Sequence, residues 1–402
     1  MNILFLTLGK MDSIEIHALY PDLLRYFRNQ QHNVYIMSAY EKRFTKQTVC
    51  IDEKGARILR VKVGNLTKCN IIEKGISTIT LESRFKKAIK QYFSDVKFDL
   101  VMYSTPPITF CKAVEFVKKR DGAKTYLLLK DIFPQNAVDL GMMRKTGIKG
   151  LIYRYFRQKE KRLYDISDKI GCMSEANVDY VLKNNPQIDK NKVEVCPNSI
   201  EPVDMSVSTE VRNSLRKQYD IPLDKKVFVY GGNLGKPQGI PFLIDCLRSQ
   251  KDNADAFFLI VGGGTEYGKL ESYVESEKPS NVKLMARIPK EDYDRMVAAC
   301  DVGMIFLDHR FTIPNFPSRL LAYMKAKLPV LAVTDANTDV GEVITEGGFG
   351  WWCESNDVSG FSDIVDLAMK DTDDKGDIAF EYLENNYSVK LGYEIIMKSI
   401  GE

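Results

Sequence analysis

Residues 227–244 read VFVYGGNLGKPQGIPFLI, in which an apolar strand pattern runs into a glycine-rich loop and a helical pattern begins near Ile240. A strand, a loop and a helix in this order make up half of a β-α-β unit. Short apolar runs alternate with longer amphipathic stretches along the rest of the chain, which predicts a parallel sheet. The expected strands are 3–8, 34–38, 58–63, 100–104, 125–129, 169–173 and 193–196, then 227–230, 257–261, 282–285, 302–306 and 330–333. Helices in the first half are expected at 14–30, 83–93, 108–119, 149–164 and 175–183.

Two series of such units are separated by residues 201–208, EPVDMSVS, which show no periodicity. With 402 residues the chain is too long for one ordinary domain. We therefore expect an α/β protein with two Rossmann-like, doubly wound domains facing a cleft, over residues 1–203 and 204–376. Ligands of such sheets bind beyond the carboxyl ends of the strands, so the loops after the strands are the places to search.

Composition excludes several classes of protein. The 57 basic and 54 acidic residues give a net charge of +3, which does not indicate a nucleic-acid binder. The eight cysteines are scattered without a CxxC pair and there are three histidines, so we expect a reducing cytoplasm and no metal site. The apolar start MNILFLTLG reads as a strand rather than a signal peptide, and no run of 18 apolar residues is present.

The loop after the strand at 227–230 is the strongest candidate site. Its glycines at 231, 232, 235 and 239 allow backbone N–H groups to approach an anion, and Lys236 adds a full charge. A nucleotide diphosphate suits such a loop. The alternative is a turn whose glycines serve only tight packing. A second glycine cluster, LIVGGGTEYG at 259–268, contains Gly263 and is either a structural turn or a further contact.

Two other loops carry polar residues after a strand. Pro317, Ser318 and Arg319 would start a helix with free N–H groups, a hydroxyl and a guanidinium, which suits a phosphate unless this is an ordinary capped helix. Lys130 and Asp131 follow the strand at 125–129, where Asp131 either orients or deprotonates a hydroxyl or caps a turn. Gly9 and Ser104 also end strands and would line the same edge of the first domain.

The segment 144–162 has eight basic residues against one acid, a net charge of +7, with aromatic residues between them. This pattern is typical of a helix on an anionic membrane surface. A solvated basic face over a core stripe explains it equally well.

Five segments together resemble glycosyltransferase family 4, the retaining GT-B group. They are KDIFPQNAVDLG at 130–141, YDISDKIGCMSE at 164–175, VCPNS at 195–199, GNLGKPQG at 232–239 and PSRLLAYM at 317–324. The resemblance covers nearly the whole chain and is greatest to the branch that builds bacterial O-antigen and capsular polysaccharide, including N-acetylfucosaminyltransferase-like members.

The resemblance implies roles for individual residues. Lys236 and Arg319 would stabilise the departing diphosphate, and Asp131 would position the acceptor. The other implied donor-binding residues are Gly232, Asn233, Gly235, Gln238, Gly239, Gly263, Arg287, Ile288, Asn315 and Ser318, and the implied acceptor-side residues are Gly9, Ser104 and Lys130. The first domain would bind the acceptor and the second the nucleotide sugar, and the segment 377–402 would cross back to the first domain. No metal or separate cofactor is expected, because positive side chains and helix dipoles neutralise the leaving group.

The chain also departs from the family pattern. Two glutamates usual around the third motif correspond here to Pro314 and Ala322, and two basic residues usual around the glycine loop correspond to Asn233 and Gln238. The expected activity is transfer of a sugar from a nucleotide diphosphate to a saccharide or polyprenyl-linked saccharide, in the cytoplasm or at the inner face of the plasma membrane. A degenerate nucleotide-sugar binder and a nucleotide-sugar epimerase remain as alternatives, while a nicotinamide dehydrogenase is disfavoured because no acid follows the second glycine cluster at ribose distance.

Overall fold

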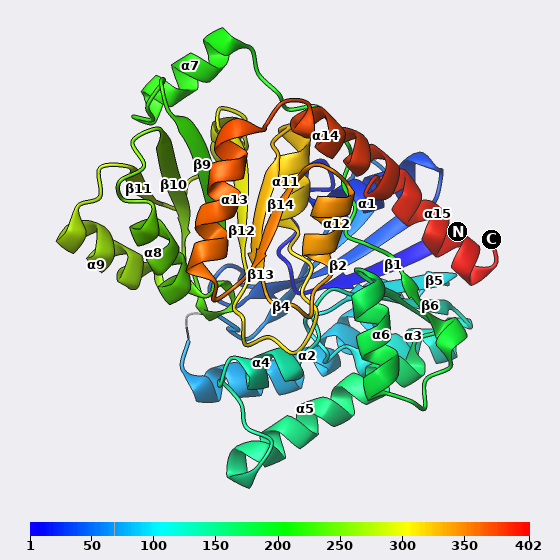
Figure 1. The fold of residues 1–402 in the computed structure, drawn as a ribbon. Helices are drawn as coiled ribbons and strands as arrows, with labels where there is room; N and C mark the ends of the chain where they lie inside the picture. Colours follow the sequence, from blue (N-terminus) through cyan, green and yellow to red (C-terminus); the bar gives the residue numbers. More distant parts are fainter. Residues whose placement is uncertain (68) are drawn as a thin grey trace. The chain divides into compact units, whose positions relative to one another are not determined.

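The structure is a computed structural model and describes residues 1–67 and 69–402. It divides into two compact units, Met1–Glu201 with Val389–Glu402, and Pro202–Ser388. Each unit has its own sheet with helices on both faces (Figure 1). The predicted fold class, α/β with two doubly wound domains, is confirmed. The cleft stays a prediction.

The sheet of the first unit has the strand order β3-β4-β2-β1-β5-β6-β7-β8. All neighbouring strands are parallel except β3, which pairs antiparallel with β4. The central strands are buried on both faces, which is why they read as continuous apolar runs. The strands are β1 (Asn2–Thr7), β2 (Asn33–Glu41), β3 (Val49–Glu53), β4 (Ala56–Val63), β5 (Leu100–Ser104), β6 (Lys124–Leu129), β7 (Lys169–Cys172) and β8 (Val193–Val195).

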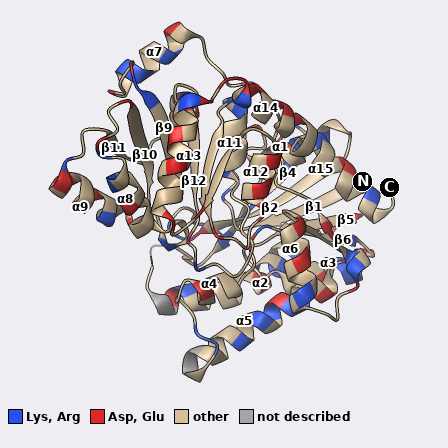
Figure 2. Ribbon diagram, viewed as in Figure 1, with Lys and Arg blue, Asp and Glu red and all other residues tan. Residues whose placement is uncertain are grey.

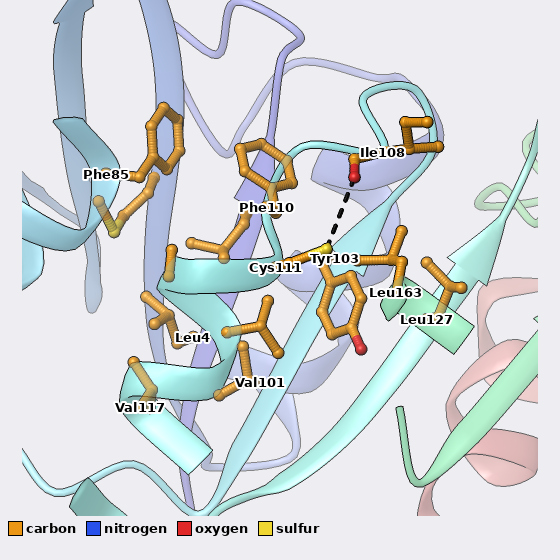
Figure 3. Packing of buried hydrophobic residues seen from close by; sticks show 14 of the residues in the cluster. Leu4, Phe85, Val101, Tyr103, Ile108, Phe110, Cys111, Val117, Leu127 and Leu163 are labelled. Carbon is orange, nitrogen blue, oxygen red and sulfur yellow. Dashed lines mark hydrogen bonds between the residues drawn. The ribbon is translucent and has the colours of Figure 1, made fainter. Parts of the chain in front are cut away.

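The helices of this unit form two layers. One face of the sheet packs against α2, α3, α5 and α6, and the other against α1 and α15. Figure 3 shows part of the first layer, where the Tyr103 ring lies beside Leu163 of α5 and the thiol of Cys111 donates to the Ile108 carbonyl at 3.7 Å. The helices are α1 (Leu19–Asn29), α2 (Ile71–Tyr92), α3 (Cys111–Asp121), α4 (Gln135–Asp139), α5 (Gly147–Ile166), α6 (Glu175–Asn184), the 3-10 turn η1 (Lys190–Lys192) and α15 (Val389–Ile400).

Two helix starts differ from the sequence expectation for local reasons. Helix α2 begins twelve residues before the expected 83, because the Asn70 side chain accepts from the Glu73 N–H at 2.8 Å and caps the helix there. Helix α1 begins at Leu19 rather than at 14, because Pro21 lacks the N–H that a further N-terminal turn would need.

The sheet of the second unit has the order β11-β10-β9-β12-β13-β14, and all its strands are parallel. Its strands are β9 (Lys226–Asn233), β10 (Ala256–Gly263), β11 (Val282–Ala286), β12 (Val302–Phe306), β13 (Val330–Thr334) and β14 (Gly350–Glu354). Its helices are α7 (Thr209–Gln218), the 3-10 turn η2 (Lys236–Gln238), α8 (Ile240–Ser249), α9 (Tyr267–Glu277), α10 (Lys290–Val297), α11 (Arg319–Lys325), α12 (Val340–Glu346), α13 (Val358–Lys370) and α14 (Lys375–Asn386).

Both sheets have a point where the strand order reverses direction. In the first sheet it lies between β1 and β5, and in the second between β9 and β12. The loops that leave these strands diverge to opposite faces and form a crevice where ligands of such sheets bind. Gly9 and Ser104 therefore lie at one such point, and the loops after β9 and β12 lie at the other.

The expected terminal segment 377–402 is divided in the structure. Helix α14 belongs to the second unit and packs against α11, whereas α15 belongs to the first unit and packs against α1. The Tyr393 ring of α15 lies 4.8 Å from that of Phe27, between ring centroids. The first unit thus ends at 201 and resumes at 389, whereas the sequence predicts boundaries at 203 and 376. In the part of the chain that the structure describes, the helices are too short or too polar to cross a membrane.

Candidate functional site

The end of β9 and the loop after it owe their shape to two glycines. Gly232 has a φ of +123° and Gly239 a φ of +58°, both in the region that favours glycine. A Cβ on Gly239 would lie 3.4 Å from the Cα of Asp308, in the loop after β12. The two loops are also joined by a hydrogen bond from the Asp308 N–H to the Pro237 carbonyl at 3.0 Å. Helix α8 starts directly after Gly239, so its N-terminus faces this crevice.

Asn233 and Gln238 brace this loop. The Asn233 amide donates to Gln238 Oε1 at 2.7 Å, and the Gly235 N–H donates to the same oxygen at 3.3 Å. These residues occupy the positions where the family resemblance implies basic side chains. In this chain they hold the loop closed through neutral hydrogen bonds, so the positive charge must come from elsewhere.

Lys236 is exposed and lines a pocket of about 460 Å³ at the carboxyl ends of β9 and β12. Lys269, His309 and Arg310 also line the pocket. Lys269 is paired with Glu266, and Arg310 is paired with Asp308 at 2.7 Å. Although burial acts to raise the pKa of Asp308, its bonds with Arg310 hold it below the usual range. Among the described residues, Lys236 forms no ion pair. The other lining residues include Gly239, Pro241, Phe242, Asp245, Leu307, His309, Ser355 and Asn356.

Arg319 lies beside the start of the same loop, at Gly232. Its guanidinium stacks over the Tyr230 ring, 4.2 Å from the centroid, and its Nη2 would lie 3.2 Å from a Cβ on Gly232. Burial acts to lower its pKa, but Tyr230, Tyr323 and Tyr293 around it raise the pKa overall, so it stays charged. Its Nη1 is buried without a hydrogen-bond partner. Because a buried unpaired donor is costly, this atom is poised for an anionic acceptor.

Asn315 and Ser318 lie between β12 and α11. The Asn315 carbonyl accepts from the Thr338 hydroxyl at 2.6 Å, while its Nδ2 is buried without a partner. Ser318 is exposed at the start of α11 and its hydroxyl makes no capping hydrogen bond. Pro314 and Ala322 occupy the positions of the family's two glutamates, so this loop offers amide and hydroxyl groups in place of carboxylates.

The second glycine cluster is explained mainly by backbone packing. A Cβ on Gly262 would lie 2.0 Å from the Gly232 carbonyl oxygen, and one on Gly264 would lie 2.4 Å from the Leu234 carbonyl oxygen. These glycines allow the turn after β10 to press against the loop after β9. Gly263 differs, since a Cβ there would meet nothing within 4 Å. Arg287, exposed, and Ile288, half-buried, follow β11 one strand further away.

Replacing Gly262 with alanine is expected to destabilise the second unit by about 1–3 kcal/mol, because the added methyl group meets a backbone oxygen that has no room to move. Urea unfolding followed by circular dichroism measures this change. Gly268→Ala, in α9, is the matched control, because a Cβ at this position would meet nothing within 4 Å. Equal stability of the two variants would contradict the packing explanation.

The expected acceptor-side residues gather at the carboxyl ends of β1, β5 and β6. Ser104 is buried at the end of β5, and Gly9 is exposed after β1 with its N–H donating to Thr7 Oγ1 at 3.0 Å. The Lys130 amine donates to the Cys196 carbonyl at 3.0 Å, which directs it toward β8. Burial lowers its pKa.

Asp131 follows β6 and is held by two neighbours. Its N–H donates to Thr105 Oγ1 at 3.1 Å, and its Oδ1 accepts from the Asn136 amide at 2.7 Å. Burial raises the pKa of its carboxyl to about 6, in spite of the bond from Asn136. A carboxyl with a pKa in this range can exchange a proton near neutral pH.

Sequence reasoning missed several residues near these loops. Asp308, His309 and Arg310 follow β12 directly, so the same signal of polar residues after an apolar strand could have found them. Asp335, directly after β13, is buried, and burial raises the pKa of its carboxyl to about 6. The tyrosines around Arg319 come from β9, α10 and α11, and no local pattern in the sequence connects them.

A cluster in the first unit combines His17, Asp22 and Glu201, whose ligand atoms lie within 4.8 Å of one another. Arg25 already lies among them, with its Nη2 2.7 Å from Asp22 Oδ1 and 2.7 Å from Glu201 Oε2. A guanidinium thus takes the place that a cation would need, and the group is an ion-pair network.

The basic segment 144–162 includes most of α5 (Figure 2). Arg157 is bound to the buried Glu160 at 2.6 Å, Lys159 to Glu82 at 2.8 Å and Arg162 to Glu115 at 2.5 Å. By contrast, Arg144, Lys145, Arg154 and Lys161 form no ion pair within the described part of the chain. The side chain of Lys149 lies outside the described ones. About half of the predicted charge is therefore available at the surface.

Comparison with known proteins adds to this geometry. Residues 211–381 match the family model described as "Glycosyl transferases group 1". The chain is similar to the probable glycosyltransferase WbjE of Pseudomonas aeruginosa, with 25% identity over 301 residues that cover 74% of this chain and 72% of the relative. It is also similar to WcaI of Escherichia coli (strain K12), a putative colanic acid biosynthesis glycosyl transferase, with 23% identity over 242 residues, 59% of this chain and 58% of the relative.

Among solved structures, the chain resembles Anabaena Alr3699/HepE in complex with UDP-glucose, with a TM-score of 0.70 and 15% identity over 100% of this chain and 99% of that one. At this identity the likeness concerns the fold. The segment matched by the family model includes the β9 loop, Lys236 and Arg319. Residues 211–381 therefore resemble the glycosyl transferases of group 1.

Proposed function

We propose that the protein transfers a sugar from a nucleotide diphosphate to a saccharide or polyprenyl-linked saccharide during polysaccharide biosynthesis. The relatives WbjE and WcaI are named as glycosyltransferases, and the HepE structure contains UDP-glucose. These names support the reaction class and the nucleotide-sugar donor. The chain also resembles N-acetylfucosaminyltransferases of O-antigen and capsule synthesis. We therefore propose nucleotide-activated N-acetylfucosamine as the first donor to test.

One observation carries the proposal. The buried, unpartnered Nη1 belongs to Arg319, whose guanidinium lies beside Gly232, and the unpaired amine belongs to Lys236 within the loop 232–239, at the reversal point of the second sheet. Two cations and the N-terminus of α8 make this loop suited to a diphosphate. As the bond to the sugar breaks, charge grows on the leaving diphosphate, and fixed positive groups stabilise it.

The same groups support a reaction without a metal or a cofactor, which we propose here. Lys236, Arg319 and the N–H groups of the loop would perform the neutralisation that a divalent cation performs in other enzymes. Asn315 and Ser318 would bind the sugar or ribose in place of the carboxylates of the family pattern. Activity that persists in excess EDTA supports this, and activity restored only by Mg²⁺ or Mn²⁺ contradicts it.

The proposal is tested with a panel of UDP-, GDP- and dTDP-sugars in the presence and absence of acceptor saccharides. A glycosyltransferase forms a glycosidic product only with both substrates present. Conversion of a nucleotide sugar without acceptor identifies an epimerase, and binding without turnover identifies a degenerate protein. Either of these outcomes replaces the proposal.

Asp131 provides a prediction about pH. If its carboxylate orients the acceptor hydroxyl, the ionised form is required, and this form is lost as the pH falls through about 6. We expect kcat/KM for the acceptor to fall about tenfold per pH unit below that value. Asp131→Asn should remove this dependence and leave a lower, flat profile.

Asp335 makes a suitable comparison, because burial also raises its pKa to about 6. Asp335→Asn should keep the acidic limb of the profile that Asp131→Asn loses. A limb that disappears only in the Asp335 variant would assign the titration to the second unit and contradict the role of Asp131.

We also propose that the segment 144–162 holds the protein at the cytoplasmic face of the membrane, where a polyprenyl-linked acceptor is found. Its unpaired residues Arg144, Lys145, Arg154 and Lys161 supply the charge. Arg157 does not belong to this group, since its guanidinium is bound to Glu160 and to the Asn185 side chain at 2.6 Å.

A further inference from the structure

Exposed apolar side chains are concentrated on two helices of the first unit. Of the fourteen large apolar side chains exposed in the described part of the chain, six lie on α2, on α5 or just before α5. Five of them, between 37% and 60% exposed, form what we call the α2–α5 surface: Ile76 and Ile79 on α2, and Leu151, Ile152 and Tyr155 on α5. Single exposed apolar residues are ordinary, but such a gathering marks an interaction surface.

An ion pair links the two helices. Lys159 Nζ of α5 lies 2.8 Å from Glu82 Oε1 of α2. Ile152 precedes Lys159 by about two helical turns and Ile79 precedes Glu82 by about one, so both isoleucines lie toward the starts of their helices from this ion pair. Figure 1 shows both helices beginning at the lower left of the view.

Charge selects the partner of this surface. The segment 144–162 alone carries a net charge of +7, whereas the whole chain carries +3. The unpaired Arg144, Lys145 and Arg154 flank the exposed Leu151 and Ile152 in the sequence, and the exposed Arg84 and Lys87 follow Ile79 on α2. Exposed apolar side chains on helices that also carry exposed cations match an anionic bilayer, whose acyl region accepts the former and whose headgroups attract the latter.

We propose that the α2–α5 surface inserts its apolar side chains into an anionic lipid bilayer, at the level of the headgroups and upper acyl chains. This deepens the membrane contact proposed for 144–162: it adds α2 as a second point of attachment and makes insertion, in addition to charge, the source of binding. Two points of attachment also hold the unit in one orientation, because a single helix leaves it free to rotate.

The test is flotation of the full-length protein with vesicles of phosphatidylcholine alone and with about 30% phosphatidylglycerol. Wild type should float with the anionic vesicles and remain partly bound at about 0.5 M NaCl, where attraction between charges is mostly screened. A variant with four serine substitutions should bind about tenfold less or weaker still, both at low salt and at about 0.5 M NaCl. The substitutions are Ile76→Ser, Ile79→Ser, Leu151→Ser and Ile152→Ser. The matched control replaces exposed apolar residues of the second unit, Val211, Leu223 and Leu367, with serine and should bind as wild type does.

Each contrary outcome has a definite meaning. Equal binding of the apolar variant and wild type, with both released by salt, would overturn insertion. Absence of wild-type binding to anionic vesicles would overturn the membrane surface altogether. Calorimetric titration of the same proteins with UDP, GDP and dTDP reads the proposed donor site separately, and thermal unfolding verifies that the variants are folded.

Discussion

Replacing Arg319 with glutamine is expected to lower kcat/KM for sugar transfer by about 100-fold to 1,000-fold, as for the loss of one preorganised charged donor to a developing anion. The guanidinium is already oriented by the Tyr230 ring at 4.2 Å and by the glycine at 232, which leaves space for it. It therefore needs little rearrangement when charge develops on the diphosphate. Steady-state kinetics with the donor identified from the nucleotide-sugar panel measure the effect.

Two comparisons separate this role from a general loss of structure. Arg319→Lys keeps the charge but not the planar group that stacks on Tyr230, and should recover only part of the activity. Arg295→Gln, at an exposed position of α10, should retain wild-type kinetics. If Arg319→Gln keeps normal kcat/KM while the protein is folded, the guanidinium does not act on the leaving group.

Replacing Lys236 with alanine is expected to weaken nucleotide diphosphate binding by about 1–3 kcal/mol, because a hydrogen bond to a charged group is lost. The amine is exposed on the pocket of about 460 Å³ and forms no ion pair among the described residues. No local partner has to be broken before it binds a phosphate. Isothermal titration calorimetry with nucleoside diphosphates measures the change.

The neighbouring Lys269 provides the control for this effect. It lines the same pocket but is paired with Glu266, so its removal should change affinity less than Lys236→Ala does. A similar loss from both variants would show that the pocket responds only to its total charge. Unchanged affinity in Lys236→Ala would exclude a direct contact.

The fold was largely predictable because buried parallel strands are continuous apolar runs. Strand β3 and strand β14 escaped prediction for opposite reasons. Strand β3 is an edge strand, VCIDE, only half-buried and half polar. Strand β14, GWWCE, lies at an edge of the second sheet and alternates buried and exposed positions. Its apolar run is so short that the sequence resembles a loop. Edge strands are defined by the neighbour they pair with, and this information is not local in the sequence.

The candidate site was predictable at the level of loops and less so at the level of contacts. The strand-to-loop pattern identified residues 231–239, and the structure gives Gly232 and Gly239 positive φ values that suit glycine. The pattern could not show that the Asn233 and Gln238 side chains bind each other. It also could not show that Arg319 stacks over Tyr230, or that Lys236 lines the pocket of about 460 Å³. Such contacts join residues from different elements, and tertiary packing decides them.

Basic residues illustrate the same limit. The net charge of 144–162 indicated a surface, but Arg157 and Lys159 are used in ion pairs with Glu160 and Glu82. Charge counts in a sequence cannot distinguish a paired cation from a free one. The structure also added α2 to this surface, since the start of that helix depends on its Asn70 cap.

The central claim is that Lys236, Arg319 and the N–H groups of the loop 232–239 bind a diphosphate. The most direct test is calorimetry of wild type and the double variant Lys236→Ala, Arg319→Gln with UDP, GDP and dTDP and with the corresponding nucleosides. For at least one base, wild type should bind the diphosphate about 100-fold or more tightly than the nucleoside, and the double variant should lose most of this difference. Equal affinity of a folded wild type for diphosphate and nucleoside, or an undiminished difference in the double variant, would contradict the claim.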